Sequence, residues 1–399
     1  MTPHHPRGRA GAIATAAAAG ALAGAATTVA ISAYALRRLV TPERDRPDTI
    51  EVHSVDLGAT PPSVELSADI DTVVPGRYGL WLGGGRGHAR LGDVLAFDPA
   101  AGRVTREVLG VDAGTLRPGR ARWNGYYYGG DPRSSLGLDF ASVSIPGPVG
   151  QLPAWHVPPA ASYDEPASPQ GARWAVLVHG RGALRSECLR ALPVLHRSGW
   201  HCLVVGYRND EDAPSSGDRR YALGLAEWAD VDAALGWALE QGAGSFALMG
   251  WSMGGAIVLQ TLSRSSYASM VTHAVLDAPV VDWNDVLAHH IRLGRMPRVV
   301  SAVAPQVLRS RAAARLVGVT SPLDVAETDW AARAAELRHR VLLIHSLDDE
   351  FVPVGPSLAL AAARPDLVRL ERWEVARHTK EWNTDPQRWE AVVADFLGG

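Results

Sequence analysis

The segment Gly250-Trp251-Ser252-Met253-Gly254 decides the fold of this chain. It has the form Gly-x-Ser-x-Gly; the apolar run 246–249 leads into it and the run 256–262 leads out. That order predicts a strand, a sharp turn and a helix, with Ser252 held in a strained backbone conformation and its hydroxyl exposed. Larger side chains at positions 250 and 254 would collide with such a turn, so glycine is expected at both.

A serine hydroxyl is a weak nucleophile until a base removes its proton, so the rest of the chain should supply that base. The run Val341 to His345 is typical of a short buried strand, and it leads into an acidic turn that contains Asp349. Such a turn lies on the edge where open α/β sheets place their sites. An alternating segment, Val368 to Val375, predicts a last strand before His378. The chain thus has a nucleophile, an acid and a base in the order serine, aspartate, histidine.

These segments resemble the α/β-hydrolases, and most of all the bacterial branch related to prolyl-oligopeptidase-like and acyl-transfer hydrolases. The resemblance covers roughly residues 147–399. It rests on four pieces in the right order: His179-Gly180-Arg181-Gly182, the turn at Ser252, His345 to Pro353, and His378 to Pro386. In the family's common form, His-Gly-x-x-Asp-x-x-Val-Pro, the acid is Asp349, and Ser346 here replaces the usual glycine.

The chemistry of the family assigns a role to each residue. Ser252 attacks a carbonyl carbon, His378 takes and later returns the proton, and Asp349 fixes the imidazole. The oxyanion needs two donors. One is expected to be the backbone N–H of Met253, which follows the nucleophile, and the resemblance implies that the other is the N–H of Arg181. No metal or other cofactor is required.

Other residues compete for the role of the acid. Asp348 adjoins Asp349, and Asp277 follows the buried run His273 to Leu276, on which some α/β-hydrolases carry their acid. We favour a capping role for Asp277. His345 is interpreted as a packed, hydrogen-bonded histidine, and His179 as a support of the oxyanion loop.

The predicted fold is α/β: an α/β-hydrolase with a mostly parallel eight-stranded sheet flanked by helices, over residues 138–399. A small helical cap is expected at about 282–337, because that stretch is long and helix-compatible. Residues 47–137 alternate short apolar runs with turn signals, which predicts a β-rich amino-terminal region. Its glycine-rich segment Gly83 to Gly87 closes no nucleotide-binding motif.

Composition excludes some classes of function. The chain of 399 residues carries a formal net charge of −3, so charge gives no case for nucleic-acid binding. Cys188 and Cys202 do not form a disulfide framework, and the pairs His4-His5 and His289-His290 lack the spacing of a metal site.

The amino terminus predicts a membrane association. Gly11 to Leu36 carries no charge and is flanked by arginines, and its length of about 26 residues is enough to span a bilayer as a helix. We expect one uncleaved anchor followed by a linker that ends near residue 46. A signal cleaved after Ala33-Tyr34-Ala35, and hence secretion, is the alternative. A chain that begins near Asp48 is then expected to be soluble and active.

The sequence favours hydrolysis of carboxylic esters through an acyl-enzyme on Ser252. A serine peptidase or acyl-peptide hydrolase is the second choice, since roughly 100 residues are too few for the β-propeller of such enzymes. A membrane-tethered binding protein with an idle hydrolase fold is the third. Trp251, Trp283 and Trp382 belong either to the core or to an apolar acyl pocket.

Overall fold

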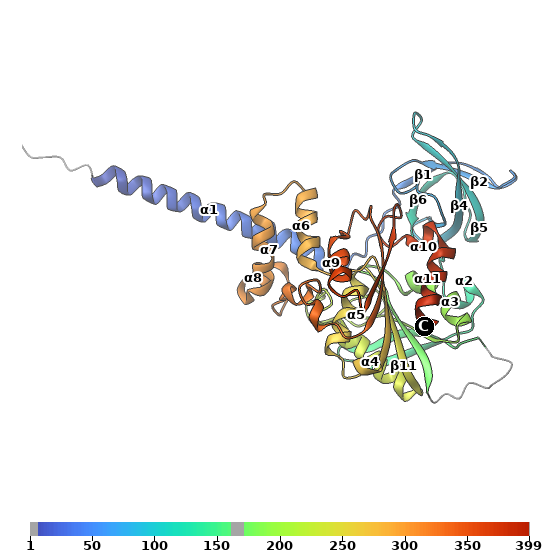
Figure 1. The fold of residues 1–399 in the computed structure, drawn as a ribbon. Coiled ribbons are helices and arrows are strands. Elements are labelled where there is room, and N and C mark those ends of the chain that lie inside the picture. Colours follow the sequence, from blue (N-terminus) through green and yellow to red (C-terminus); the bar gives the residue numbers. More distant parts are fainter. Residues whose placement is uncertain (1–6, 161–170, 399) are drawn as a thin grey trace, which may run out of the picture.

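The computed structural model describes residues 7–160 and 171–398; within α1 (Arg7–Val40), side chains are described from Leu22 onward. The chain has three parts: the long helix α1, a small barrel, and a sheet with helices on both faces (Figure 1). The predicted α/β-hydrolase fold is confirmed.

The sheet has eight strands in the order β14-β13-β12-β11-β9-β10-β8-β7. The strands β9 to β14 pair in parallel, whereas β7 and β8 form an antiparallel edge. Their bounds are β7 Ala141–Gly147, β8 Gly150–Val157, β9 Ala172–Val178, β10 His201–Val205, β11 Ala243–Trp251, β12 Val271–Asp277, β13 Arg340–Ser346 and β14 Val368–Trp373.

Helices cover both faces because the central strands are apolar on both sides. On β9, Val176 and Val178 belong to one core cluster, whereas Ala175 and Leu177 belong to the other. Outside the segment between β12 and β13, the chain after β9 forms the 3-10 helices η1 Arg185–Ala191 and η2 Ala268–Met270 and the α-helices α3 Leu192–Arg197, α4 Trp228–Glu240, α5 Met253–Arg264, α9 Gly355–Ala363, α10 Glu381–Thr384 and α11 Pro386–Gly398.

A helical cap lies between β12 and β13, within the predicted range 282–337. It comprises α6 Trp283–Leu293, α7 Val299–Arg309, α8 Arg311–Val317 and two 3-10 turns, η3 Val325–Thr328 and η4 Ala334–Glu336. Asp282 caps α6 by accepting from the backbone N–H of Asn284, which fixes where the cap begins.

The amino-terminal β-rich region is a closed barrel in the order β1-β2-β5-β4-β3-β6. Its strands are β1 Ile50–Asp56, β2 Ser63–Ser67, β3 Tyr78–Leu82, β4 Gly87–Asp98, β5 Arg103–Ala113 and β6 Gly119–Asn124, and the short helix α2 (Pro132–Leu136) connects it to the sheet. Inside, the guanidinium of Arg106 donates to the backbone oxygens of Thr72, Val74, Gly76 and Gly92. These bonds fix the segment 72–76 beside the barrel, whose core is an apolar cluster that includes Val64, Leu66 and Leu91.

The structure of helix α1 corrects the prediction of a membrane-spanning anchor. Its carboxyl end packs among α7 and α8, with Leu36 and Val40 fully buried in the protein core, while the rest projects away from the body (Figure 1). The predicted segment Gly11 to Leu36 therefore has its last turns in protein, and its first residues lie outside the described side chains. In the part of the chain that the structure describes, no helix has both the length and the apolar character needed to span a bilayer. A membrane-spanning helix is thus not supported.

Candidate active site

Ser252 occupies the turn between β11 and α5. Its φ of 52° and ψ of −118° lie outside the regions that an ordinary residue adopts, as the sequence predicts for a nucleophile at such a turn. The two glycines permit this bend: a Cβ on Gly254 would lie 2.1 Å from the carbonyl oxygen of Val178, and one on Gly250 would lie 2.5 Å from the oxygen of Gly254. The backbone is held in place by a bond from the N–H of Ser252 to the oxygen of Asp277.

His378 lies between Ser252 and Asp349. Its Nε2 is 2.9 Å from Oγ of Ser252, and its Nδ1 is 2.7 Å from Oδ2 of Asp349. The loop after β14 turns the ring inward, with positive φ values of 68° at Arg377 and 53° at Thr379 on either side of it. The structure therefore brings together the three side chains that the sequence assigned as nucleophile, base and acid.

Asp349 is held in its charged form by its surroundings. Burial by itself would raise the pKa of this carboxyl, but the charge of His378 and hydrogen bonds from His345 and His378 outweigh burial and keep the pKa well below its usual value. Its Oδ1 also accepts from the backbone N–H groups of Phe351 and Val352, both at 2.8 Å. His345 is fully buried and bonds Oγ of Ser357, in agreement with a supporting role.

The two competing aspartates have other partners. Asp348 accepts from the backbone N–H groups of Ala376 and Arg377, both at 3.0 Å, and so fixes the loop that carries the histidine. Asp277 accepts from Nε1 of Trp389 at 2.8 Å. Neither contacts the His378 ring among the hydrogen bonds of the described residues.

Glu381 is a buried acid that sequence reasoning missed. Its Oε1 accepts from the N–H of Ser346, and its burial, together with the charge of Asp277, raises its pKa well above the usual value. Among the described residues, Oδ1 of Asp277 and Oε2 of Glu381 lack any other partner. The raised pKa of Glu381 favours its neutral form beside Asp277. No local pattern around Glu381 signals this, because the two acids meet only in the folded chain.

The loop His179 to Gly182 is fixed from several sides. The N–H of Gly180 donates to Glu187 at 2.7 Å, and the hydroxyl of Tyr207 donates to the oxygen of Gly180 at 2.9 Å. His179 pairs with Asp210 at 2.9 Å; burial lowers the pKa of the histidine, but the charge of Asp210 outweighs it and raises that pKa.

The two N–H groups assigned to the oxyanion hole are available. In residues 7–160 and 171–398, the backbone N–H of Met253 and that of Arg181 donate to no protein acceptor. Met253 also begins α5, so its N–H lies at the positive end of that helix, which favours a negative charge.

The side chain of Arg181 reaches the end of α1. Its Nε donates to the oxygen of Leu39 at 2.6 Å, and its Nη2 donates to those of Arg38 and Thr41 at 2.8 and 2.9 Å. These carbonyls close a helix whose dipole is negative at this end, so a guanidinium is stabilising there.

The barrel holds the segment that follows the base. Nδ2 of Asn383 donates to the backbone oxygens of Arg77 and Gly125, and Lys380 pairs with Asp71 at 2.7 Å. The side-chain oxygen of Asn383 accepts from Arg190 at 3.2 Å. The barrel is thus bonded to the loop that positions His378. The sequence does not predict this contact, because its partners are about 300 residues apart.

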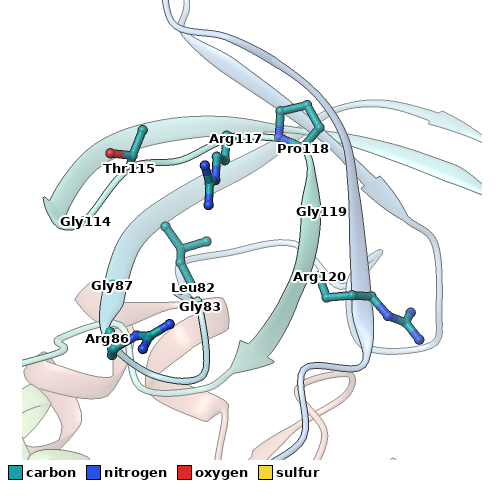
Figure 2. Close-up of a pocket in the computed structure, with 10 residues that line it drawn as sticks. All are labelled: Leu82, Gly83, Arg86, Gly87, Gly114, Thr115, Arg117, Pro118, Gly119 and Arg120. Carbon is teal, nitrogen blue, oxygen red and sulfur yellow. The ribbon is translucent and has the colours of Figure 1, made fainter.

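Two cavities differ in their relation to these residues. One, of about 730 Å³, lies between the end of α1 and α6, and Arg181 and Phe351 line it. Another, of about 420 Å³, lies at an end of the barrel, and Figure 2 shows its three arginines, with Arg120 directed away from Arg86 and Arg117. The barrel cavity contains none of the residues assigned to catalysis. No cluster of metal-binding side chains occurs among the residues that the structure describes.

Comparison with known proteins agrees with this architecture. A family model described as the alpha/beta hydrolase fold matches residues 175–354, which include the turn at Ser252 and the acid loop. The chain is an α/β-hydrolase superfamily protein. A second family model, described only as a domain of unknown function, matches residues 51–124, which form the barrel of this α/β-hydrolase.

Solved structures share the fold. An esterase from Pyrococcus furiosus matches with 15% identity and a TM-score of 0.51, covering 67% of this chain and 94% of that one. The same esterase in another crystal form matches with 17% identity and a TM-score of 0.50, covering 68% and 96%. No curated protein matches the sequence.

Proposed function

We propose that this α/β-hydrolase is a serine hydrolase that cleaves carboxylic esters. The observation that carries the proposal is the position of His378, 2.9 Å from Oγ of Ser252 and 2.7 Å from the carboxylate of Asp349. A base within hydrogen-bond reach of a hydroxyl, itself oriented by a buried acid, is the arrangement that activates a serine.

The reaction follows from these contacts. Nε2 of His378 takes the hydroxyl proton as Oγ of Ser252 bonds to the ester carbon, and the N–H groups of Met253 and Arg181 bind the resulting oxyanion. The tetrahedral intermediate then breaks its bond to the alkoxide, which leaves as the alcohol with the proton from His378. Water, deprotonated by the same ring, attacks the acyl-enzyme and releases the carboxylic acid and the free serine.

Two serine substitutions, one at the start of α5 and a control near its end, test the proposal. Ser252→Ala should abolish labelling by a fluorophosphonate probe and turnover of p-nitrophenyl acetate, while Ser263→Ala, an exposed serine on α5, should retain both. The hydroxyl is the only group removed in each case. Full activity in Ser252→Ala would reject a serine mechanism. Faster turnover of aminoacyl-arylamides than of esters by the unaltered protein would favour a peptidase instead.

We also propose that the protein associates with membranes through the amino-terminal part of α1, because Gly11 to Leu36 carries no charge. Full-length protein should then sediment with lipid vesicles in high salt, and replacing Leu22, which is exposed, by Arg should weaken that binding. Equal sedimentation of the unaltered protein and the Leu22→Arg variant would argue that this part of α1 does not bind the vesicles. A mature chain that begins at Leu36 would mean a cleaved signal, although cleavage there would remove the buried Ser32 and Ala33.

A further inference from the structure

The cavity of about 730 Å³ between α1 and α6 is lined by apolar and polar residues. Its apolar lining comes from Leu39, Val286, Leu287, Ile291, Met296 and Phe351. Arg37, Arg38 and Glu43 line it as well and supply the polar groups. The volume lies within the usual range of small-molecule sites, about 300–1,000 Å³.

Two of its lining residues also lie close to the catalytic triad that we propose, Ser252, His378 and Asp349. The ring of Phe351 lies 5.1 Å from the ring of His378, centre to centre. The side chain of Arg181 lines the cavity, and its backbone N–H is one of the two assigned to the oxyanion hole. The cavity therefore lies next to a ring that contacts the base and to a residue assigned to the oxyanion hole.

The end of α1 is a fixed wall of this cavity. Arg181 bonds three backbone oxygens at that end, and the N–H of Tyr221 donates to the oxygen of Val40 at 2.8 Å. On the opposite side, Nε2 of His290 in α6 bonds the backbone oxygen of Phe351 at 2.9 Å. Both walls are thus tied to loops of the active site, so the width of the cavity is set by the fold.

We infer that this cavity binds the acyl chain of the substrate, and that α1 sets the length of chain that fits. The substrates are then esters of apolar acyl chains, which makes the inference a refinement of the proposed ester hydrolysis on which it rests. The wall that selects them lies outside residues 175–354, the part that matches the hydrolase family model.

The test measures kcat/KM for p-nitrophenyl esters from acetate to dodecanoate, a series in which only the acyl chain changes. For the unaltered protein we expect a rise of up to about fourfold for each added methylene until the cavity is full. Ala35→Trp fills the cavity from α1, since Ala35 lines it and is partly exposed. It should move the optimum to shorter chains and lower kcat/KM for long chains at least tenfold relative to kcat/KM for acetate in the same variant.

Two further variants keep the result interpretable. Ala26→Trp adds the same ring to an exposed position of α1 and should leave the profile unchanged. Met296→Trp fills the cavity from the cap side and should shift the optimum as Ala35→Trp does, even if the α1 variant folds poorly. A profile identical in all four proteins, with acetate turned over normally, would overturn the acyl-chain inference alone. Absence of both acetate turnover and probe labelling in the unaltered protein would overturn the ester-hydrolase proposal and this inference with it.

Discussion

Asp349→Asn should remove nearly all activity without unfolding the protein. The amide oxygen can keep the two backbone bonds, from Phe351 and Val352, that Oδ1 now accepts at 2.8 Å. The amide nitrogen then faces Nδ1 of His378, which Oδ2 now contacts at 2.7 Å. Two donors cannot bond each other, so the imidazole keeps its proton on Nε2, where it faces Ser252 and cannot accept the hydroxyl proton.

The size of the loss follows from that wrong tautomer. In a serine protease, the equivalent substitution lowers kcat about 10⁴-fold, which corresponds to about 5.5 kcal/mol of transition-state stabilisation. We expect a fall in kcat of the same order here, measured with p-nitrophenyl acetate, and a thermal unfolding transition that remains cooperative.

Asp348→Asn is the matched control. Its oxygen can still accept from the N–H groups of Ala376 and Arg377, and the charge that it loses faces Arg377 at 3.5 Å in a partly exposed pair. Such pairs contribute about 1 kcal/mol or less, so kcat should fall by less than about tenfold. A larger loss in Asp348→Asn than in Asp349→Asn, or equal losses, would show that Asp349 is not the acid.

Three further results are expected. Asn383→Ala leaves the oxygens of Arg77 and Gly125 without their donor, and should lower the free energy of unfolding in urea by about 2–4 kcal/mol; an unchanged midpoint would contradict the link between barrel and base. A chain that begins at Asp48 loses the buried Leu36 and Val40, and should be less stable by roughly 3–6 kcal/mol in the same assay; equal stability would show that α1 is separable. Because the folded-state pKa of Asp349 lies below its ordinary value of 3.8, the stability that this carboxylate contributes is complete above about pH 4 and is lost as pH falls through the lowered pKa. Unfolding curves at pH 6 and pH 3 should therefore differ more for the unaltered protein than for Asp349→Asn.

The sequence predicts the sheet, and it singles out three side chains that lie together in the structure, because these signals are local or ordered along the chain. Gly250 and Gly254 are required by clashes with neighbouring backbone, and the apolar runs before Ser252 and Asp349 match β11 and β13. Each of these features depends on a few adjacent residues. The order of the three segments then restricts the fold, since the carboxyl ends of parallel strands meet at one edge.

Other features depend on contacts between distant segments, and no local pattern predicts them. Glu381 follows His378 closely in the sequence, but its raised pKa depends in part on Asp277, which lies at the end of β12. Asn383 bonds the barrel through backbone oxygens, which any residue supplies, so the partner residues carry no signal of the contact. A bond to a carbonyl group leaves no trace in the sequence of its acceptor.

Helix α1 shows how one composition permits two environments. Alanine-rich, charge-free sequence suits a lipid phase, but small side chains also let a helix approach other helices closely, and α1 packs against α7 and α8 at its carboxyl end. At the carboxyl end of α1 the environment is protein, since Leu36 and Val40 are both fully buried. The cap is thereby completed by a segment that precedes the barrel in the chain. Arg181 bonds the end of this helix through its side chain, and its backbone N–H is one of the two that we propose for the oxyanion hole, so a displacement of α1 should alter catalysis as well as the cavity.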